Sequence, residues 1–355
     1  MAFAYYTPYN INSAQVPSTQ SNFPVLVNVT DARFKTVGNG GHVQNANGYD
    51  IRPYTDGTLS SAISNYELER YNASTGELIM WVKVSSVSSS TTPFVLAYGD
   101  SGISTDGSSG VGTFATQTYH LKDGTTLSVL DARGAFNGTN NGATATSGQI
   151  DGGAAFVAAS SQYISTANTG TWAENVDTTI TFWFKTSANS QILIGKNSNT
   201  GAGGWYFLTQ PTGKLSLQVK NSGGTVTLSR DSSTTINDNA WRHAAAVFHI
   251  NTSGSSGQDI QMYINGASDQ GTLTNTGASA DDGAGGLLFA RRNVGASPLY
   301  FTGSLDEIRV WKSTALTADW IATEYNNQGA PATFATLGSE IPVGTGSSNF
   351  FLLFR

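Results

Sequence analysis

The chain has 355 residues, of which 18 are Lys or Arg and 24 are Asp or Glu, so its formal net charge is −6. Charged residues make up 12% of the chain, about half of the share in an ordinary globular domain, which excludes a coiled coil and a charge-driven disordered chain. The sequence contains no cysteine, which excludes disulfides, thiolate zinc sites and cysteine nucleophiles.

The acidic balance and the lack of a Lys/Arg-rich segment argue against a nucleic-acid partner. No apolar run approaches the roughly 18 residues that a membrane span needs. The chain begins with Met1, and its first basic residue is Arg33, so the pattern of a secretory signal is absent. We expect a protein that stays in the cytoplasm or leaves by assembly into a virus particle; a chain whose signal had been removed would read the same.

Short apolar runs with period-two alternation, separated by Gly, Asn, Asp and Ser, fill the sequence and predict an all-β protein. In the first hundred residues the runs at 23–29, 76–84 and 93–99 have this pattern. Residues 101–112 are rich in Gly, Ser, Thr and Asp, and we interpret them as a linker.

A second array of strands follows the linker, and its regular spacing predicts one β-sandwich of roughly 200 residues. The runs lie at residues 179–184, 191–194, 205–208, 215–219, 241–250, 260–264, 287–289 and 308–311. One helix is predicted after them: Thr317 is a suitable N-cap, Asp319 lies in the first turn, and Leu316 with Ile321 can pack across the cap.

The last segment, residues 331–355, is Gly/Ser/Thr-rich and ends on an apolar run. Such a run would be an exposed sticky patch if it were solvated. We expect it to fold back as a strand or to dock on another subunit in an assembly. The residues expected to make that contact are Phe350, Phe351, Leu352, Leu353 and Phe354.

Several short sequence motifs in residues 1–100 occur in the same order as in a known protein family. They are residues 5–11 (YYTPYNI), 22–27 (NFPVLV), 40–51 (GGHVQNANGYDI), 66–71 (YELERY), 76–84 (GELIMWVKV) and 98–100 (YGD). This segment resembles the small β-sandwich domain of unknown function called DUF2341, which implies an N-terminal β-sandwich of its own.

Residues 113–330 resemble the laminin-G-like (LamG) jelly roll of the concanavalin-A-like lectins. The words that carry this resemblance are residues 120–124 (HLKDG), 160–164 (SSQYI), 179–185 (TITFWFK), 241–248 (WRHAAAVF), 262–266 (MYING) and 303–311 (GSLDEIRVW). Proteins that pair these two domains occur among bacteriophage structural proteins and bacterial surface proteins. The two resemblances together imply two β-sandwiches, to which the capping pattern at Thr317 adds one short C-terminal helix.

The LamG resemblance implies one structural calcium ion, held by an Asp of the last strand and by an early loop. Asp306 matches that last-strand position, and Asp131 is the natural early-loop candidate. If Leu305 and Glu307 share one face, Asp306 points to the other, where a loop can meet it. The alternatives are ion pairs of Asp306 with Arg309 or an arginine of a neighbouring strand, and of Asp131 with Arg133.

A sugar site would combine an aromatic side chain with amide and carboxylate groups on loops. Asn197, Asn199, Asn275 and Asp282 are candidates for ligand binding, with ordinary Asn/Gly turns and a solvated Asp281–Asp282 turn as the alternatives. Trp205 is expected to pack in the core. We find no glycosidase pair of the form Glu-x-Asp-x-x-Glu and no Gly-x-Ser-x-Gly motif, so no catalytic residue is predicted.

These observations favour a non-enzymatic structural or adhesion protein of a virion, for example a component of a phage tail or capsid, with a lectin-like outward domain. We expect a homo-oligomer that contacts other virion proteins and host glycans. The alternatives are a carbohydrate-binding module of a bacterial surface protein and a glycan hydrolase.

Overall fold

The structure is a computed structural model that describes residues 3–88, 93–108, 115–122, 126–167, 174–197, 203–254, 256–292 and 299–344. In these residues strands dominate, and the two α-helices are α1 (Ala318–Gly329) and α2 (Pro331–Phe334). The predicted all-β class is therefore confirmed. Within the same residues, neither helix combines the length and the apolar character needed to cross a membrane.

The chain divides into two compact units, formed by residues 1–114 with 330–355 and by residues 115–329. The described part of the predicted linker, residues 101–108, belongs to the first unit. The described part of the predicted tail, residues 331–344, also belongs to it, because β25 (Ala335–Leu337) and β26 (Ile341–Pro342) both pair with β1 (Tyr5–Ile11). The predicted return of the tail as a strand is thus seen for these residues, whereas Phe350–Phe354 lie outside the described part of the chain.

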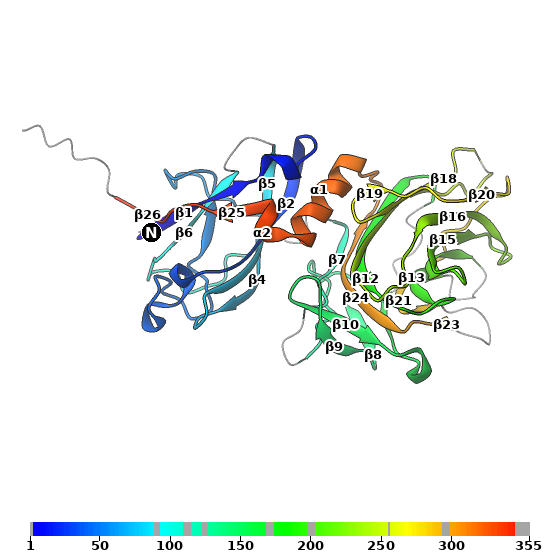
Figure 1. Ribbon diagram of the computed structural model, residues 1–355, viewed down its shortest axis with the longest axis horizontal. Helices are drawn as coiled ribbons and strands as arrows, with labels where there is room; N and C mark the ends of the chain where they lie inside the picture. The colour runs from blue at the N-terminus through cyan, green and yellow to red at the C-terminus, as the bar shows by residue number, and fades with distance from the viewer. Residues whose placement is uncertain are drawn as a thin grey trace, which may run out of the picture. The chain divides into compact units, whose positions relative to one another are not determined.

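The first unit contains a five-stranded and a three-stranded sheet (Figure 1). The strands of the larger sheet are β25 (Ala335–Leu337), β1 (Tyr5–Ile11), β6 (Phe94–Tyr98) and β3 (Arg52–Tyr54), with β26 (Ile341–Pro342) beside β1. The smaller sheet orders β2 (Gln20–Thr30), β5 (Glu77–Val87) and β4 (Tyr66–Asn72). The buried Tyr9 of β1 donates a hydrogen bond to the carbonyl of Leu26 in β2 at 2.9 Å, which joins the two sheets.

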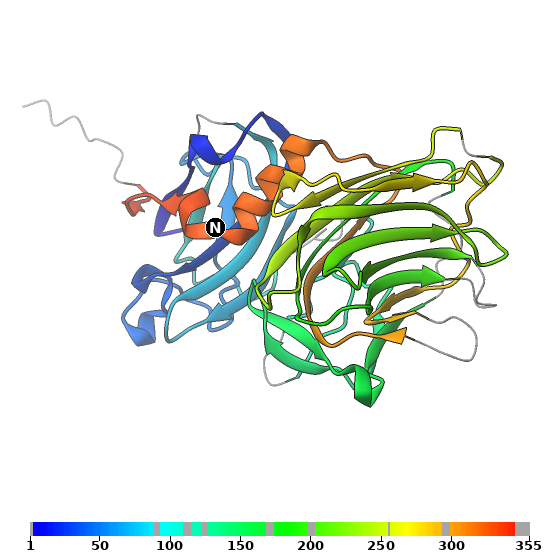
Figure 2. The same cartoon turned by 45° about the vertical axis from the view of Figure 1, so that its right-hand side comes forward.

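The second unit contains two eight-stranded sheets, whose ribbons face each other in Figures 1 and 2. The two sheets share one apolar core. The first sheet orders β19 (Ala267–Ser268), β18 (Asp259–Ile264), β17 (Arg242–His249), β12 (Asp177–Lys185), β24 (Gly303–Trp311), β10 (Gly152–Phe156) and β9 (Thr144–Ser147), with β7 (Gln117–Tyr119) beside β24. The second sheet orders β20 (Leu273–Asn275), β16 (Val226–Thr235), β15 (Lys214–Lys220), β14 (Gly204–Thr209), β13 (Ile192–Asn197), β21 (Leu287–Phe289), β11 (Tyr163–Thr166) and β8 (Gly138–Asn141). A separate hairpin joins β22 (Arg291–Arg292) to β23 (Leu299–Tyr300).

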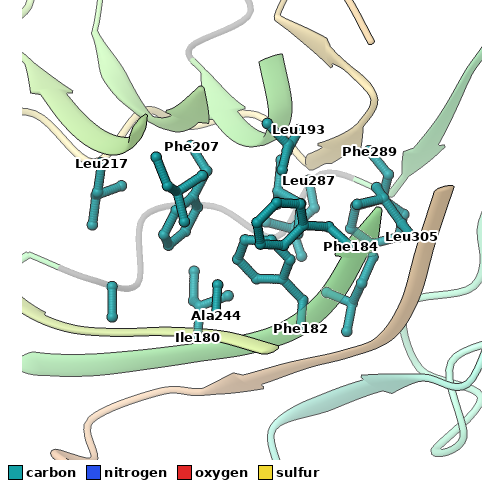
Figure 3. Close-up of a cluster of buried hydrophobic side chains, with 14 of the residues drawn as sticks. Ile180, Phe182, Phe184, Leu193, Phe207, Leu217, Ala244, Leu287, Phe289 and Leu305 are labelled. Carbon is teal, nitrogen blue, oxygen red and sulfur yellow. The ribbon is translucent and has the colours of Figure 1, made fainter. Parts of the chain in front are cut away.

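The alternation of β12 explains how this sandwich is built. Ile180, Phe182 and Phe184 point into the core, where Phe182 meets Phe207 of β14 edge-to-face at 5.0 Å (Figure 3). Because successive side chains of a strand point to opposite faces, the intervening Thr181 and Trp183 face away from the core. The core therefore lies between the two eight-stranded sheets, as a jelly-roll sandwich requires.

Helix α1 packs against the outer face of the first eight-stranded sheet. Trp183 donates a hydrogen bond to Gln328 at 2.6 Å, and its ring stacks on Tyr325 at 5.7 Å. The predicted cap is confirmed, because the hydroxyl of Thr317 accepts a hydrogen bond from the backbone N–H of Trp320 at 3.2 Å.

Candidate functional site

The outer face of the second eight-stranded sheet carries a cluster of tyrosines and cationic side chains. In β14, Trp205 and Phe207 lie in the core, so the alternation turns Tyr206 to the other face. In β15, Leu217 and Val219 lie in the core, and Gln218 and Lys220 point to the same outer face as Tyr206. The register places Tyr206 opposite Gln218, whose Oε1 accepts a hydrogen bond from the tyrosine hydroxyl at 2.9 Å.

Tyr206 lies between two cations. The guanidinium of Arg292 is 4.8 Å from the centre of its ring, and Nζ of Lys220 is 5.6 Å from the same point. Both separations are within the range of cation–π attraction. The strand beside Tyr206 carries Gly195, and a Cβ there would lie 3.1 Å from the Cβ of Tyr206, so the absence of a side chain leaves room for the tyrosine.

The neighbouring arginine makes a second contact of the same kind. Arg291 lies 4.4 Å from the ring centre of Tyr163 and 5.7 Å from that of Tyr300, and the two rings are 6.3 Å apart. The hairpin β22–β23 therefore directs two consecutive arginines to tyrosines of β11 and β14. We name these six residues the tyrosine–arginine patch: Tyr163, Tyr206, Lys220, Arg291, Arg292 and Tyr300.

The charges of the patch are close enough to affect one another. Burial, and next the positive charge of Arg292, lower the pKa of Lys220. Burial also raises the pKa of Tyr206, and Arg292 partly offsets this. The chain as a whole is acidic, so three cations on one face are not a consequence of its composition. An anionic group at the patch would relieve the repulsion between Lys220 and Arg292.

Backbone N–H groups donate hydrogen bonds to both predicted calcium ligands, Asp306 and Asp131. Oδ2 of Asp306 accepts from the N–H groups of Gln149 and Ile150 at 2.7 and 2.9 Å. Asp131 accepts from three backbone N–H groups, those of Thr118 at 3.0 Å and of Ala135 and Phe136 at 3.2 Å each. Calcium requires oxygen ligands, so these contacts do not fit a calcium ion, and its binding stays a prediction.

The expected alternation around Asp306 is only half correct. Asp306 does meet a loop, since a Cβ on Gly148 of that loop would lie 2.6 Å from its Oδ2. Leu305 points into the core, but Glu307 does not share its face, because Glu307 has a φ of 49° and lies at a bulge between β12 and β24. Arg309 forms ion pairs with Glu307 at 2.7 Å and with Glu324 at 3.1 Å.

The four predicted ligand-binding residues are not among the six residues of the patch, and two of them have side chains outside the described atoms. Asp282 is fully buried and paired with Lys196 at 2.9 Å, so it lies neither in a solvated turn nor at the surface. Asn275 is exposed, and its carbonyl oxygen accepts from the N–H of Gly277 at 3.0 Å, as in an ordinary turn. Asn197 ends β13, and its side chain lies outside the described part of the structure, as does all of Asn199. Trp205 packs in the core, as predicted.

The sequence interpretation did not identify the tyrosine–arginine patch. Two signals were available: the alternation of residues 205–208, which turns Tyr206 outward, and the arginine doublet at 291 and 292. The meeting of these residues could not be predicted, because their strands are far apart in the sequence and the topology alone brings them together.

Comparison with known families supports the jelly-roll assignment. Residues 158–322 match a family described as the concanavalin A-like lectin/glucanases superfamily, and this range contains the whole patch. The predicted LamG resemblance is thus confirmed for these residues. The DUF2341 resemblance of residues 1–100 stays a prediction. A search among curated proteins finds no match to the sequence.

Several solved structures are similar to part of the chain at low identity. The binding domain of Paraclostridial mosquitocidal protein 1 is 15% identical, with 59% of this chain and 51% of that one covered and a TM-score of 0.44. Domain 4 of AbnA, a GH43 extracellular arabinanase from Geobacillus stearothermophilus in complex with arabinotriose, is 18% identical, with 60% and 98% covered and a TM-score of 0.41. The binding domain of botulinum neurotoxin serotype D is 13% identical, with 60% and 52% covered and a TM-score of 0.42. The chain thus spans about half the length of the first and third of these proteins.

Proposed function

We propose that the second unit is a non-enzymatic carbohydrate-binding module, and that it binds acidic saccharides at the tyrosine–arginine patch. The observation that carries this proposal is the position of Tyr206 between Lys220 and Arg292, at 5.6 and 4.8 Å from its ring. The match of residues 158–322 to a superfamily that includes lectins supports the same class of function.

The chemistry of the patch suits a sugar acid or a sulfated sugar. Arginine presents planar pairs of N–H donors that match a carboxylate or a sulfate, and lysine adds a mobile point charge. Tyr163 and Tyr300 provide flat apolar surface together with a hydroxyl, and both suit a sugar ring. Tyr206 is buried, so its role is to position Lys220 and Arg292 rather than to contact the sugar. Half-buried side chains at Tyr163 and Tyr300 leave part of each ring accessible to a ligand.

The test compares polymers that share one neutral backbone. Dextran, carboxymethyl-dextran and dextran sulfate are titrated against the intact chain by calorimetry at two salt concentrations, after a survey on a glycan array. We expect saturable binding of the charged polymers, which weakens with salt, and weak binding of dextran. A blank array and no calorimetric signal from the three polymers would overturn the proposed function.

Matched variants separate a built site from general charge. Lys220→Gln and Arg292→Gln should each weaken binding at least tenfold, since each removes one charged contact of roughly 1.5–3 kcal/mol. Lys214→Gln is the control, because Lys214 lies on β15, on the same face as Lys220 and roughly 20 Å along the strand. An equal loss in all three variants would show non-specific attraction and contradict a site at the patch.

The hydrolase alternative receives less support from the geometry. The two glutamates that come together in the second unit, Glu307 and Glu324, are bridged by Arg309, which holds both as ion-paired carboxylates. A glycosidase needs one protonated acid and one free carboxylate beside the scissile bond. Release of reducing ends from a bound polysaccharide would contradict the non-enzymatic assignment.

The biological setting that we propose is a virion, with a bacterial cell surface as the alternative. This proposal rests on the resemblance of the two-domain sequence to phage structural and bacterial surface proteins, and it includes homo-oligomers and contacts with other virion proteins. Co-sedimentation with particles, and the oligomeric state by light scattering, test it. Removal of residues 349–355 that left incorporation unchanged would contradict an assembly role for Phe350–Phe354.

A further inference from the structure

The first unit contains a pocket of about 400 Å³, which is within the size range of small-molecule sites. It lies beside the edge strand β3 and is closed on another side by residues 102–107. The rings of Phe3, Tyr54 and Tyr66 line it, together with the aliphatic side chains of Ile63 and Ile103. Phe3 and Tyr54 meet edge-to-face at 5.5 Å, so two of the three rings support one another.

The segment that closes the pocket is fixed, although its composition resembles that of a linker. The N–H of Gly102 donates to Oδ1 of Asp100 at 2.9 Å, and Asn45 donates to the carbonyl of Ile103 at 3.3 Å. The hydroxyl of Ser108 accepts from the N–H of Leu68 at 3.0 Å. These bonds hold the wall against the strands, so the pocket is largely pre-formed.

One cation, Arg52, lines this mainly apolar space, whose walls also include Ser64, Ser104 and Thr105. The guanidinium of Arg52 lies 5.6 Å from the ring centre of Tyr66, donates to the hydroxyl of that tyrosine, and donates to the carbonyl of Thr105 at 2.8 Å. Among the described residues, no carboxylate lies within ion-pair distance of it.

The two carboxylates whose charges act on Arg52, those of Asp50 and Asp106, accept hydrogen bonds from backbone N–H groups and form no ion pair with it. Asp50 accepts from the backbone N–H groups of Gln44, Asn45 and Gly99 at 2.9–3.1 Å. Asp106 accepts from the N–H of Ser108 at 2.8 Å. Burial lowers the pKa of Arg52, and the charges of Asp106 and Asp50 offset this effect in part. A half-buried guanidinium without a carboxylate partner is a group that an anionic ligand would stabilise.

We propose that this pocket is a binding site for a small carboxylate that carries an aromatic ring, with Arg52 holding the carboxylate and Phe3, Tyr54 and Tyr66 holding the ring. The pattern of mainly apolar walls and a few polar groups is that of small-molecule sites. The carboxylate can accept the donors of Arg52 that remain after its bonds to Tyr66 and Thr105, since a guanidinium has five. This site is independent of the patch in the second unit.

Three probes that separate the contribution of the ring from that of the carboxylate test the proposal on the intact chain. 2-Naphthoate has a ring and a carboxylate, 2-naphthalenemethanol has the ring alone, and acetate has the carboxylate alone. We expect fluorescence titration to show saturable binding of 2-naphthoate at least tenfold tighter than binding of the alcohol, and no displacement of it by equimolar acetate. Equal affinity for the alcohol, or no saturable binding of 2-naphthoate, would overturn the proposal.

Variants locate the probe in the pocket. Arg52→Gln should raise the Kd of 2-naphthoate at least tenfold and leave that of the alcohol within twofold. Arg70→Gln is the control, because Arg70 lies on β4 of the same unit, pairs with Glu77 at 3.3 Å and does not line the pocket. Ser64→Trp, at a lining residue with an exposed side chain, should fill the space and abolish binding of both naphthalene probes. If Arg52→Gln fails to fold, Ser64→Trp decides: unchanged 2-naphthoate binding by that folded variant would place the probe elsewhere.

Discussion

Lys196 and Asp282 form an ion pair of 2.9 Å in which both side chains are fully buried. Lys196 lies on β13 and Asp282 lies in the Gly-rich loop before β21, so the pair joins the two segments. Nε1 of Trp205 donates to the other carboxylate oxygen of Asp282 at 3.0 Å, and Lys196 also donates to the carbonyl of Gly283. The Gly-rich composition of this loop suggests that Asp282 is exposed. The structure shows instead that Asp282 is buried and anchors the loop in the interior.

Loss of this pair should destabilise the second unit strongly. Asp282→Asn keeps an oxygen for Trp205 but leaves the charge of Lys196 buried without its partner, which typically costs about 3–5 kcal/mol. Urea unfolding at neutral pH measures the change in the free energy of unfolding. Asp281→Asn, at the adjacent half-buried position, is the control and should cost less than about 1 kcal/mol. A small effect of Asp282→Asn would mean that the loop reorganises to hydrate the lysine.

Strands with apolar alternation could be predicted from the sequence, and polar strands could not. The run at 179–184 is found in β12, and that at 215–219 in β15, because one face of each strand must lie in the core. β16 was missed, since its ten residues place Ser, Thr, Arg and Asp on most positions and only Leu228 in the apolar core cluster. Its place is set by pairing with β15 rather than by its own pattern.

Sites were harder to predict than strands, because the residues of a site are distant in the sequence and only the order of the strands brings them together. The sequence marks Asp306 as a residue that a loop can meet, but not that the loop presents N–H groups. It also does not show the bulge at Glu307, where a non-glycine residue has a positive φ. The arginines of β22 reach tyrosines more than 80 residues away in the sequence, and no local pattern contains such a contact.

Stability should depend on Asp306 and not on calcium. Asp306→Ala would leave the N–H groups of Gln149 and Ile150 without this acceptor, at about 1–3 kcal/mol for each unsatisfied group. We expect Tm of the unaltered chain to be the same with calcium and with EDTA, and Asp306→Ala to lower it equally in both. A rise in Tm with calcium that is lost in Asp306→Ala would show that the ion binds there after all.

The N-cap of α1 should contribute modestly. Thr317→Ala removes the oxygen that accepts from the N–H of Trp320, and such a change costs about 1 kcal/mol. Thr317→Asp is the matched control and should retain most of the stability, since Asp caps as well as Thr. Thermal unfolding followed by circular dichroism compares the three chains. Equal losses for Ala and Asp would indicate that the methyl group of Thr317, and not its hydroxyl, matters.

Glu324 should make the second unit sensitive to acid. Its Oε1 accepts from Arg309 at 3.1 Å and from Gln328 at 3.2 Å, between α1 and the first eight-stranded sheet. Burial alone would raise the pKa of Glu324, but His243, whose Nε2 lies 3.7 Å from Oε2, and the charge of Arg309 outweigh it and hold the pKa below its usual value of 4.5.

A carboxyl group whose pKa is lower in the folded chain binds its proton more readily after unfolding. Its stabilising effect is therefore fully present above pH 4.5, and it is lost as the pH falls through the lower, folded value. Glu324→Gln should reduce the free energy of unfolding by about 1.5–3 kcal/mol at pH 7, because it removes one of the two carboxylates of Arg309 while the ion pair with Glu307 remains. The difference from the unaltered chain should shrink steadily as urea titrations are repeated at lower pH, below 4.5. Glu77→Gln on β5 serves as a control for general acid effects, and a Glu324→Gln curve that runs parallel to that of the unaltered chain at every pH would contradict the depressed pKa.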